Sequence, residues 1–153
     1  MSLNDLQFIE KLCEVVIYKP SLSHLDVSWC NLSPKLLARL SEELKMNARG
    51  TIRWLNLSYN MINMNNAPEA SGEFYANLIA FLEDNEELVH LDLSGMCWQK
   101  DQLMAITSLL SQDSADNLLS IHLSDNAICS NLDLKGQILD LFGIQDKTEE
   151  NNA

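Results

Sequence analysis

The stretch Leu22–Leu32, LSHLDVSWCNL, decides the fold, because three further stretches repeat its pattern. They are IRWLNLSYNMI at residues 52–62, LVHLDLSGMCW at 88–98 and LLSIHLSDNAI at 118–128. Each has apolar residues at its first, fourth, sixth and eleventh positions, serine at its seventh, and Asn, Cys or Met at its ninth. The motifs start at 22, 52, 88 and 118, and are therefore 30, 36 and 30 residues apart. Such self-similarity is typical of repeat proteins, whose units bury their apolar faces against their neighbours.

Runs with helical spacing lie between these motifs. Ser33 and Pro34 begin the first run as a capping residue and a proline at the first helical position, and Gly50 ends the unit. Apolar residues then recur three or four positions apart in each run, which predicts amphipathic helices. They are Leu36, Leu37, Leu40 and Leu44 in the first run, Phe74, Leu78, Ile79 and Leu82 in the second, and Leu103, Ile106, Leu109 and Leu110 in the third.

The four motifs resemble the leucine-rich-repeat signature L-x-x-L-x-L-x-x-N/C-x-L. The long units with full helices are similar to the ribonuclease-inhibitor-like subclass, although their lengths are irregular here. The resemblance covers most of the chain. It implies an α/β fold, namely a right-handed solenoid of about four repeats. A parallel sheet would line the concave face, helices the convex face, and helical caps both ends.

The ninth motif position carries a structural expectation. Asn60 and Asn126 can hydrogen-bond the turning backbone from inside the repeat, and Cys30 matches the signature's alternative residue. Met96 departs from the signature, because a thioether cannot supply the donors and the acceptor of an amide. We therefore expect a locally altered turn in the third motif.

Both ends carry candidate capping helices, which solenoids need. We expect one over 4–17, capped by Asn4, and one over 131–142, capped by Ser130 and ended by Gly143. Their expected inward faces are Leu6, Ile9, Cys13 and Val16 in the first, and Leu134, Ile138, Leu139 and Phe142 in the second.

These limits predict a single leucine-rich-repeat domain over 1–143, followed by a disordered acidic and polar tail over 144–153. Whether the chain is complete or ends a longer solenoid is open. Residues 63–72, NMNNAPEASG, cause the longer second spacing and are predicted to form a polar loop. The loop is either functional or a tolerated insertion.

Strand alternation places the third and fifth motif positions on the side away from the core, with the eighth position at the rim. The third-position row is His24, Trp54, His90 and Ser120, the fifth-position row is Asp26, Asn56, Asp92 and His122, and the eighth-position row is Trp29, Tyr59, Gly95 and Asp125. Two tryptophans and a tyrosine here favour a protein-binding surface, because these residues dominate binding hot spots. All members of the rows except Ser120 and Gly95 are candidate binding residues. The alternative is that Trp29 and Trp54 only pack on neighbouring side chains.

A reactive site has less support. His90 and His122 lie on neighbouring strands with Asp92 beside them, and this trio could bind a metal or position a base. His24 is too far along its row to join them, and no nucleophile signature or glycine-rich phosphate loop accompanies them. We therefore expect no enzyme, no catalytic residue, no metal and no cofactor.

Charge narrows the class of partner. The chain has 10 basic and 22 acidic side chains, for a formal net charge of −12. It should repel nucleic acid and anionic membranes, and a protein with a basic patch is its electrostatic complement. Alternatively, the acidity only keeps the protein soluble. We expect a monomer or a component of a larger complex.

The start of the chain has no basic segment followed by an apolar core, which argues against a signal peptide. Cys13, Cys30, Cys97 and Cys129 form no CxxC pair, and Cys13 and Cys129 are expected to act as small buried hydrophobes. A cytoplasmic location fits best, with nuclear or cytoskeletal locations left open. The sequence thus predicts a non-catalytic interaction module or scaffold. The alternatives are an enzyme regulator, such as an inhibitor or a GTPase-activating-like protein, and a structural subunit of a large assembly.

Overall fold

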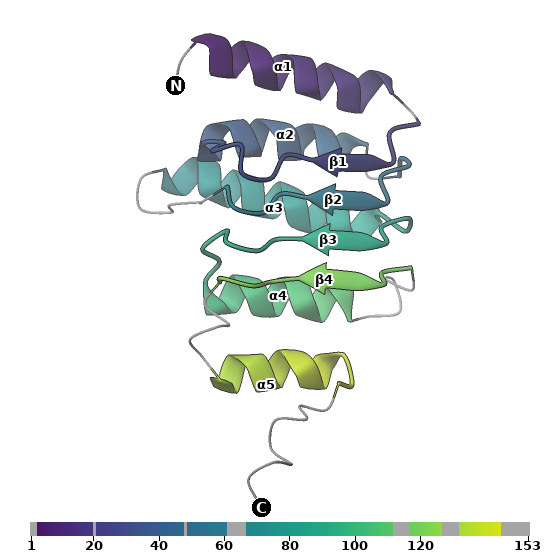
Figure 1. Cartoon of the computed structure of the whole chain (residues 1–153), viewed down its shortest axis with the longest axis vertical. Coiled ribbons are helices and arrows are strands. Elements are labelled where there is room, and N and C mark those ends of the chain that lie inside the picture. The colour runs from purple at the N-terminus through teal and green to yellow at the C-terminus, as the bar shows by residue number, and fades with distance from the viewer. Residues whose placement is uncertain are drawn as a thin grey trace, which may run out of the picture.

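The computed structural model of the 153-residue chain describes residues 3–19, 21–47, 49–60, 67–111, 117–126 and 132–144. In these ranges strands and helices alternate after an initial helix (Figure 1). The elements are α1 (Leu3–Tyr18), β1 (His24–Asp26), α2 (Pro34–Met46), β2 (Trp54–Asn56), α3 (Pro68–Asp84), β3 (His90–Asp92), α4 (Lys100–Leu110), β4 (Ser120–His122) and α5 (Leu132–Leu141).

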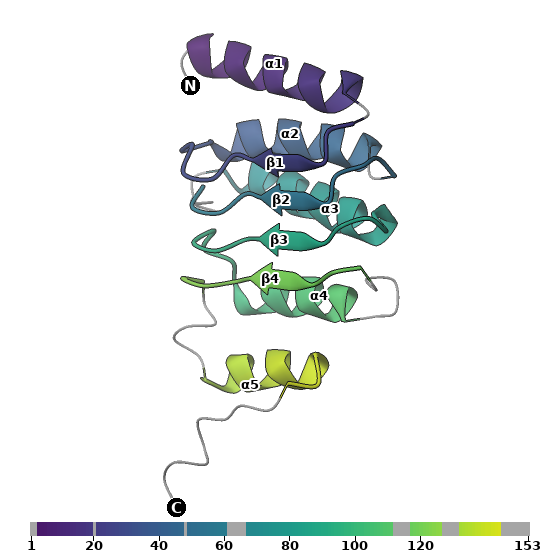
Figure 2. The ribbon, with the colours of Figure 1, turned by 45° about the vertical axis from the view of Figure 1, so that its right-hand side comes forward.

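The four strands form one parallel sheet in the order of the chain, β1-β2-β3-β4. Equivalent motif positions pair across every interface, so that Leu25, Leu55, Leu91 and Ile121 lie in register. The expected α/β class and parallel sheet are therefore confirmed. Figures 1 and 2 show the strands stacked along the long axis, with the termini at opposite ends.

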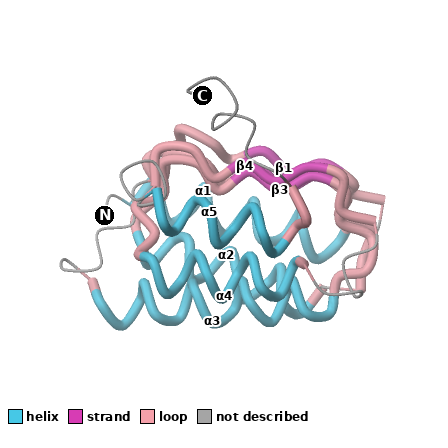
Figure 3. Tube along the Cα trace, turned by 90° about the horizontal axis from the view of Figure 1, so that it is seen from below, coloured by secondary structure: helices cyan, strands magenta, loops and turns pink. Residues whose placement is uncertain are grey.

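The helices cover one side of this sheet. Seen along the stack, α2, α3 and α4 lie together beneath the strands, and no described helix lies over the opposite side (Figure 3). We call that opposite side, with its three rows of side chains, the open sheet face. The layer between sheet and helices holds the core, where Leu55 and Leu91 are fully buried against Leu37, Phe74 and Leu103 of the helices.

Local sequence explains where α2 begins. The Ser33 hydroxyl accepts a hydrogen bond from the Leu36 amide at 3.4 Å, and Pro34 occupies the first turn, where its missing N–H costs nothing. The apolar residues expected on its inner face are all buried, as are Phe74, Leu78 and Leu82 of α3 and Leu103, Ile106 and Leu110 of α4. Ile79 and Leu109 are half-buried at the edge of this core.

The predicted loop over 63–72 is wrong in its second half. Pro68 begins α3, so residues 68–72 are helical. Pro68 suits the first turn, and Glu69 there interacts favourably with the helix dipole, which together outweigh the turn-forming character of Ser71 and Gly72. Residues 63–66 lie outside the described ranges.

The end helices lie beyond the first and last strands (Figures 1 and 2). Ile9, Cys13 and Val16 of α1 are buried, but Leu6 is 38% exposed and does not belong to the inner face. It lies at the start of α1, beyond the buried centre of the helix. In α5, Leu134 and Ile138 are buried and Leu139 is half-buried, and Phe142, just after the helix, packs against the core. The proposed cap Ser130, the buried role of Cys129 and the tail from residue 145 lie outside the described residues, as does the Asn4 side chain.

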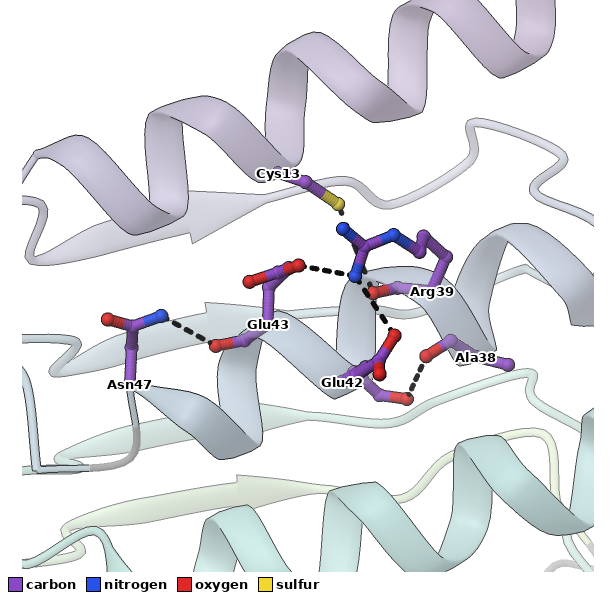
Figure 4. A network of polar contacts seen from close by, with 7 residues as sticks. Cys13, Ala38, Arg39, Glu42, Glu43 and Asn47 are labelled. Atoms are coloured by element: carbon purple, nitrogen blue, oxygen red, sulfur yellow. Dashed lines mark hydrogen bonds and ion pairs between the residues drawn. The ribbon is translucent and has the colours of Figure 1, made fainter.

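A polar contact joins α1 to α2 (Figure 4). The Cys13 thiol points to α2 and donates to the Arg39 carbonyl oxygen at 3.9 Å. The Arg39 guanidinium pairs with Glu43 and with Glu42, the latter at 3.0 Å. Burial raises the pKa of the Cys13 thiol, which keeps it protonated and suits its role as a small core residue.

Asparagine closes the turns after the strands. The buried Asn60 side chain donates to the carbonyls of Leu57, in its own unit, and Val27, in the preceding unit, and accepts from the Leu32 amide. Each such asparagine therefore stabilises two successive turns.

Asn126 acts in the same way on the third and fourth units. It donates to the carbonyls of Leu93 and Leu123 and accepts from the amides of Met96 and Trp98. Met96 itself is buried in the core. The expected altered turn is absent, because the left-handed residues Gly95 and Cys97 match those of the first unit. Met96 has no side-chain amide to close the turn of the third unit, and the side-chain amide of Asn126 in the next unit closes it instead.

No helix in the described ranges has both the length and the apolar character that crossing a bilayer requires.

Candidate protein-binding face

The third-position row forms a line of stacked rings across three strands. Trp54 of β2 stacks on His90 of β3 with centroids 3.8 Å apart, and on its other side it faces His24 of β1 at 5.9 Å, both at 21° between planes. His90 continues the line to His122 of β4, 5.0 Å away and tilted by 51°. The strand register produces this line, since it brings His24, Trp54 and His90 to equivalent positions.

His90 is the most enclosed member of the line. Its Nδ1 bonds the hydroxyl of Ser120 on β4, and Trp54 covers one face of the ring. Burial lowers the pKa of His90, the nearby His122 lowers it further, and Asp92 opposes both effects. The imidazole of His90 is therefore neutral at neutral pH.

The fifth-position row closes the strand ends. Asp26, Asn56 and Asp92 each accept a hydrogen bond at 2.9–3.0 Å from the amide of the serine two residues later. The seventh-position serine supplies its backbone amide to these bonds, and the Ser58 hydroxyl also donates to the Asn56 side-chain oxygen at 2.7 Å. His122 holds the same register position on β4, so the row ends in an imidazole.

The carboxylate of Asp26 is charged at neutral pH. Partial burial raises its pKa, but hydrogen bonds from Ser28 and from the Asn56 amide, 3.2 Å away, outweigh burial and lower the pKa overall. Asp26 is exposed, so its negative charge is accessible to a partner.

The eighth-position row forms a second line of contacts at the rim. Trp29 stacks on Tyr59 with centroids 4.0 Å apart and 14° between planes. The Tyr59 hydroxyl reaches past the third unit and donates to the Asp125 carboxylate at 2.5 Å. Gly95 lies between them, and a Cβ there would overlap the Tyr59 ring. The absence of a side chain at Gly95 is what allows Tyr59 to reach the fourth unit.

The expected packing of the two tryptophans on their neighbours is confirmed, and their role in binding stays a prediction. Trp29 and Trp54 do pack on neighbouring rings, yet 73% of Trp29 and 42% of Trp54 stay exposed. Stacking restricts their rotamers, so little further side-chain entropy is lost when a partner covers them. The face thus presents a rigid aromatic surface bordered by carboxylates.

His90, His122 and Asp92 are the alternative candidate for a metal site or a base. In the described part of the chain no three His, Cys, Asp or Glu side chains are close enough to hold a metal ion together. Ser23 bonds His24 Nδ1 at 2.8 Å and Ser120 bonds His90, but among the described residues no carboxylate bonds the second ring nitrogen of either histidine. A serine–histidine pair that lacks this third group lacks the orientation found in hydrolase triads.

The structure places each predicted residue in the row expected for it, but two residues left out of the candidates matter. Ser120 anchors His90, and Gly95 makes room for Tyr59. Membership of the third- and eighth-position rows was the available signal for both. Comparison of the chain with protein-family models, with curated proteins and with solved structures finds no match.

Proposed function

We propose that this chain is a leucine-rich-repeat solenoid of the ribonuclease-inhibitor-like subclass that serves as a non-catalytic protein-interaction module in the cytoplasm. The open sheet face is the concave, partner-binding surface in this proposal. Support for the fold comes from four strand–turn units in chain order, with equivalent motif positions in register. The asparagine-closed turns add to it.

The observation that carries the function is the exposure of Trp29 and Trp54 on a side of the sheet that no described helix covers. Large aromatic surface held in water is costly, and burying it against a partner stabilises a complex by about 25 cal/mol per Å² of apolar area. Tryptophan and tyrosine also dominate binding hot spots. A partner protein that covers both lines of rings would gain most of its affinity from them.

The test compares partner capture by three forms of the chain. Wild type, a Trp29→Ala/Trp54→Ala variant and a Tyr18→Ala/Leu119→Ala variant are each used as bait in extract from the source cell. Tyr18 and Leu119 are exposed apolar residues that belong to none of the three rows, and serve as the matched control. Binding of each captured protein is then measured with purified components.

We expect the tryptophan variant to lose binding by about 100-fold or more, since two hot-spot residues are removed, and the control variant to keep it. Circular dichroism checks that both variants stay folded. A folded tryptophan variant that binds every partner as tightly as wild type does would refute the proposal.

A further inference from the structure

Histidine and aspartate side chains lie together on the open sheet face. All three histidines of the chain lie there, beside three carboxylates. The histidines are His24, His90 and His122, and the carboxylates belong to Asp26, Asp92 and Asp125. The three carboxylates contribute a formal charge of −3 to this face. A partner with basic side chains is therefore its electrostatic complement.

The two lines of rings differ in what they offer a partner. Inside each line the ring faces cover one another, so solvent meets mainly ring edges. Trp29 ends its line at β1, the first strand of the sheet. One face of its indole contacts Tyr59, and with 73% of the residue exposed the other face is open. Trp29 thus offers an open aromatic face on the same unit as the Asp26 carboxylate.

We infer that this face binds a polypeptide segment carrying arginine, whose guanidinium stacks on the open side of Trp29 beside Asp26. The inference rests on the proposed function and specifies its partner. Further basic residues of the segment would pair with Asp92 and Asp125 along the sheet.

Chemistry favours arginine over the other charged groups. The ring face carries negative electron density, so it attracts cations and repels carboxylates and phosphates. A guanidinium is planar and weakly hydrated, so it can stack on indole and donate to a carboxylate at the same time. Lysine has a compact, strongly hydrated charge and does this less well. The net charge of −12 adds a general attraction for basic segments.

The probe is a fluorescein-labelled peptide of alternating arginine and serine, titrated with the whole protein and followed by fluorescence anisotropy. Lysine–serine and glutamate–serine peptides of equal length are the comparisons. We expect the arginine peptide to bind about fivefold or more tightly than the lysine peptide at about pH 7.5, and the glutamate peptide not to bind.

Three variants assign these effects to residues. Trp29→Asn removes the ring at a position whose φ is 56°, a conformation that asparagine tolerates, so the fold is preserved. This variant should bind the arginine peptide and the lysine peptide with equal affinity. Asp84→Asn removes an exposed carboxylate from the end of α3 and is the matched charge control. Asp26→Asn removes the carboxylate beside Trp29 and should weaken binding of the arginine peptide more than Asp84→Asn does.

Equal binding of the arginine and lysine peptides to wild type, or an arginine preference that survives in Trp29→Asn, would overturn the inference. So would an Asp26→Asn variant that binds the arginine peptide as tightly as the Asp84→Asn variant does. If the arginine peptide does not bind in preference to the lysine peptide while the Trp29→Ala/Trp54→Ala variant still loses its protein partner, the inferred arginine segment is wrong and the proposed function stands. If that variant also keeps its partner, the proposed function itself fails.

Discussion

Four residues with left-handed backbone form the eighth-position row: Trp29, Tyr59 and Asp125 at φ 56° and Gly95 at φ 62°. Left-handed backbone strains any residue with a Cβ, by about 1–2 kcal/mol. Two of the strained residues make a contact within the row. Tyr59 stacks on Trp29, and Asp125 accepts a hydrogen bond from Tyr59. Gly95 avoids the strain and also leaves space for the Tyr59 ring.

Gly95→Ala should destabilise the protein by about 2 kcal/mol or more, because it adds backbone strain and displaces the Tyr59 ring. Urea denaturation measures the change. Gly72→Ala is the matched control, since its new Cβ meets no atom within 4 Å and lies in α3, where alanine is favoured by about 0.5–1 kcal/mol. Equal stability of the two variants would contradict this account of the row.

His90 gives the folded state a pH dependence. Its pKa is lowered by burial and by His122, against the effect of Asp92, so the unfolded chain binds a proton more readily than the folded one. The free energy of unfolding therefore falls as pH drops from about 7, through the ordinary histidine range, toward the lowered pKa of His90. Above about pH 7 this contribution to stability is fully present.

His90→Gln should make the free energy of unfolding less dependent on pH in that window. Urea denaturation of wild type and variant in the same buffers measures the difference, since the other titrating groups then cancel. A wild type that loses no more stability than the variant between about pH 7 and pH 5 would show that His90 is not held neutral.

At the scale of the element, the strand–turn unit depends on its neighbour. Asn60 bonds four backbone groups in two units while fully buried. Cys30, at the equivalent position of the first unit, is exposed. One amide side chain thus completes two turns, which explains why the first and third units retain the turn without an asparagine at the ninth position.

Asn60→Ala should destabilise the protein by about 3 kcal/mol or more, because it leaves buried backbone groups without partners. Asn117→Ala is the control: Asn117 is exposed and makes one side-chain hydrogen bond, to the Glu86 carbonyl, so it should cost about 1 kcal/mol or less. Thermal and urea denaturation report both values. A loss at Asn60 no larger than at Asn117 would refute the shared-turn interpretation.

At the scale of the whole molecule, periodicity predicted the class, the strand positions and the parallel sheet. These follow from apolar spacing, which burial enforces. The start of α3 was predicted too late, because the composition of residues 63–72 resembles a loop while Pro68 favours a helical first turn. The exposure of Leu6 escaped prediction because helical spacing does not show which part of α1 the neighbouring helix covers.

The rows of the candidate site were predictable, but their contacts were not. Strand register follows from the motif, so it set His24, Trp54 and His90 side by side. Stacking depends on rotamers, and the bond from Tyr59 to Asp125 depends on a glycine one unit away. A pattern in one unit carries no information on which side chain spans two.

The order of the strands also determines how the molecule responds to force. The termini lie at opposite ends of the stack, and each strand pairs only with its neighbours in the chain (Figure 1). Tension between the ends runs along the direction of the interstrand hydrogen bonds, so it opens one interface at a time and never shears several together. Under force applied to its two ends, the protein should therefore extend readily and in successive small steps. A sandwich of interlocked sheets would resist the same force.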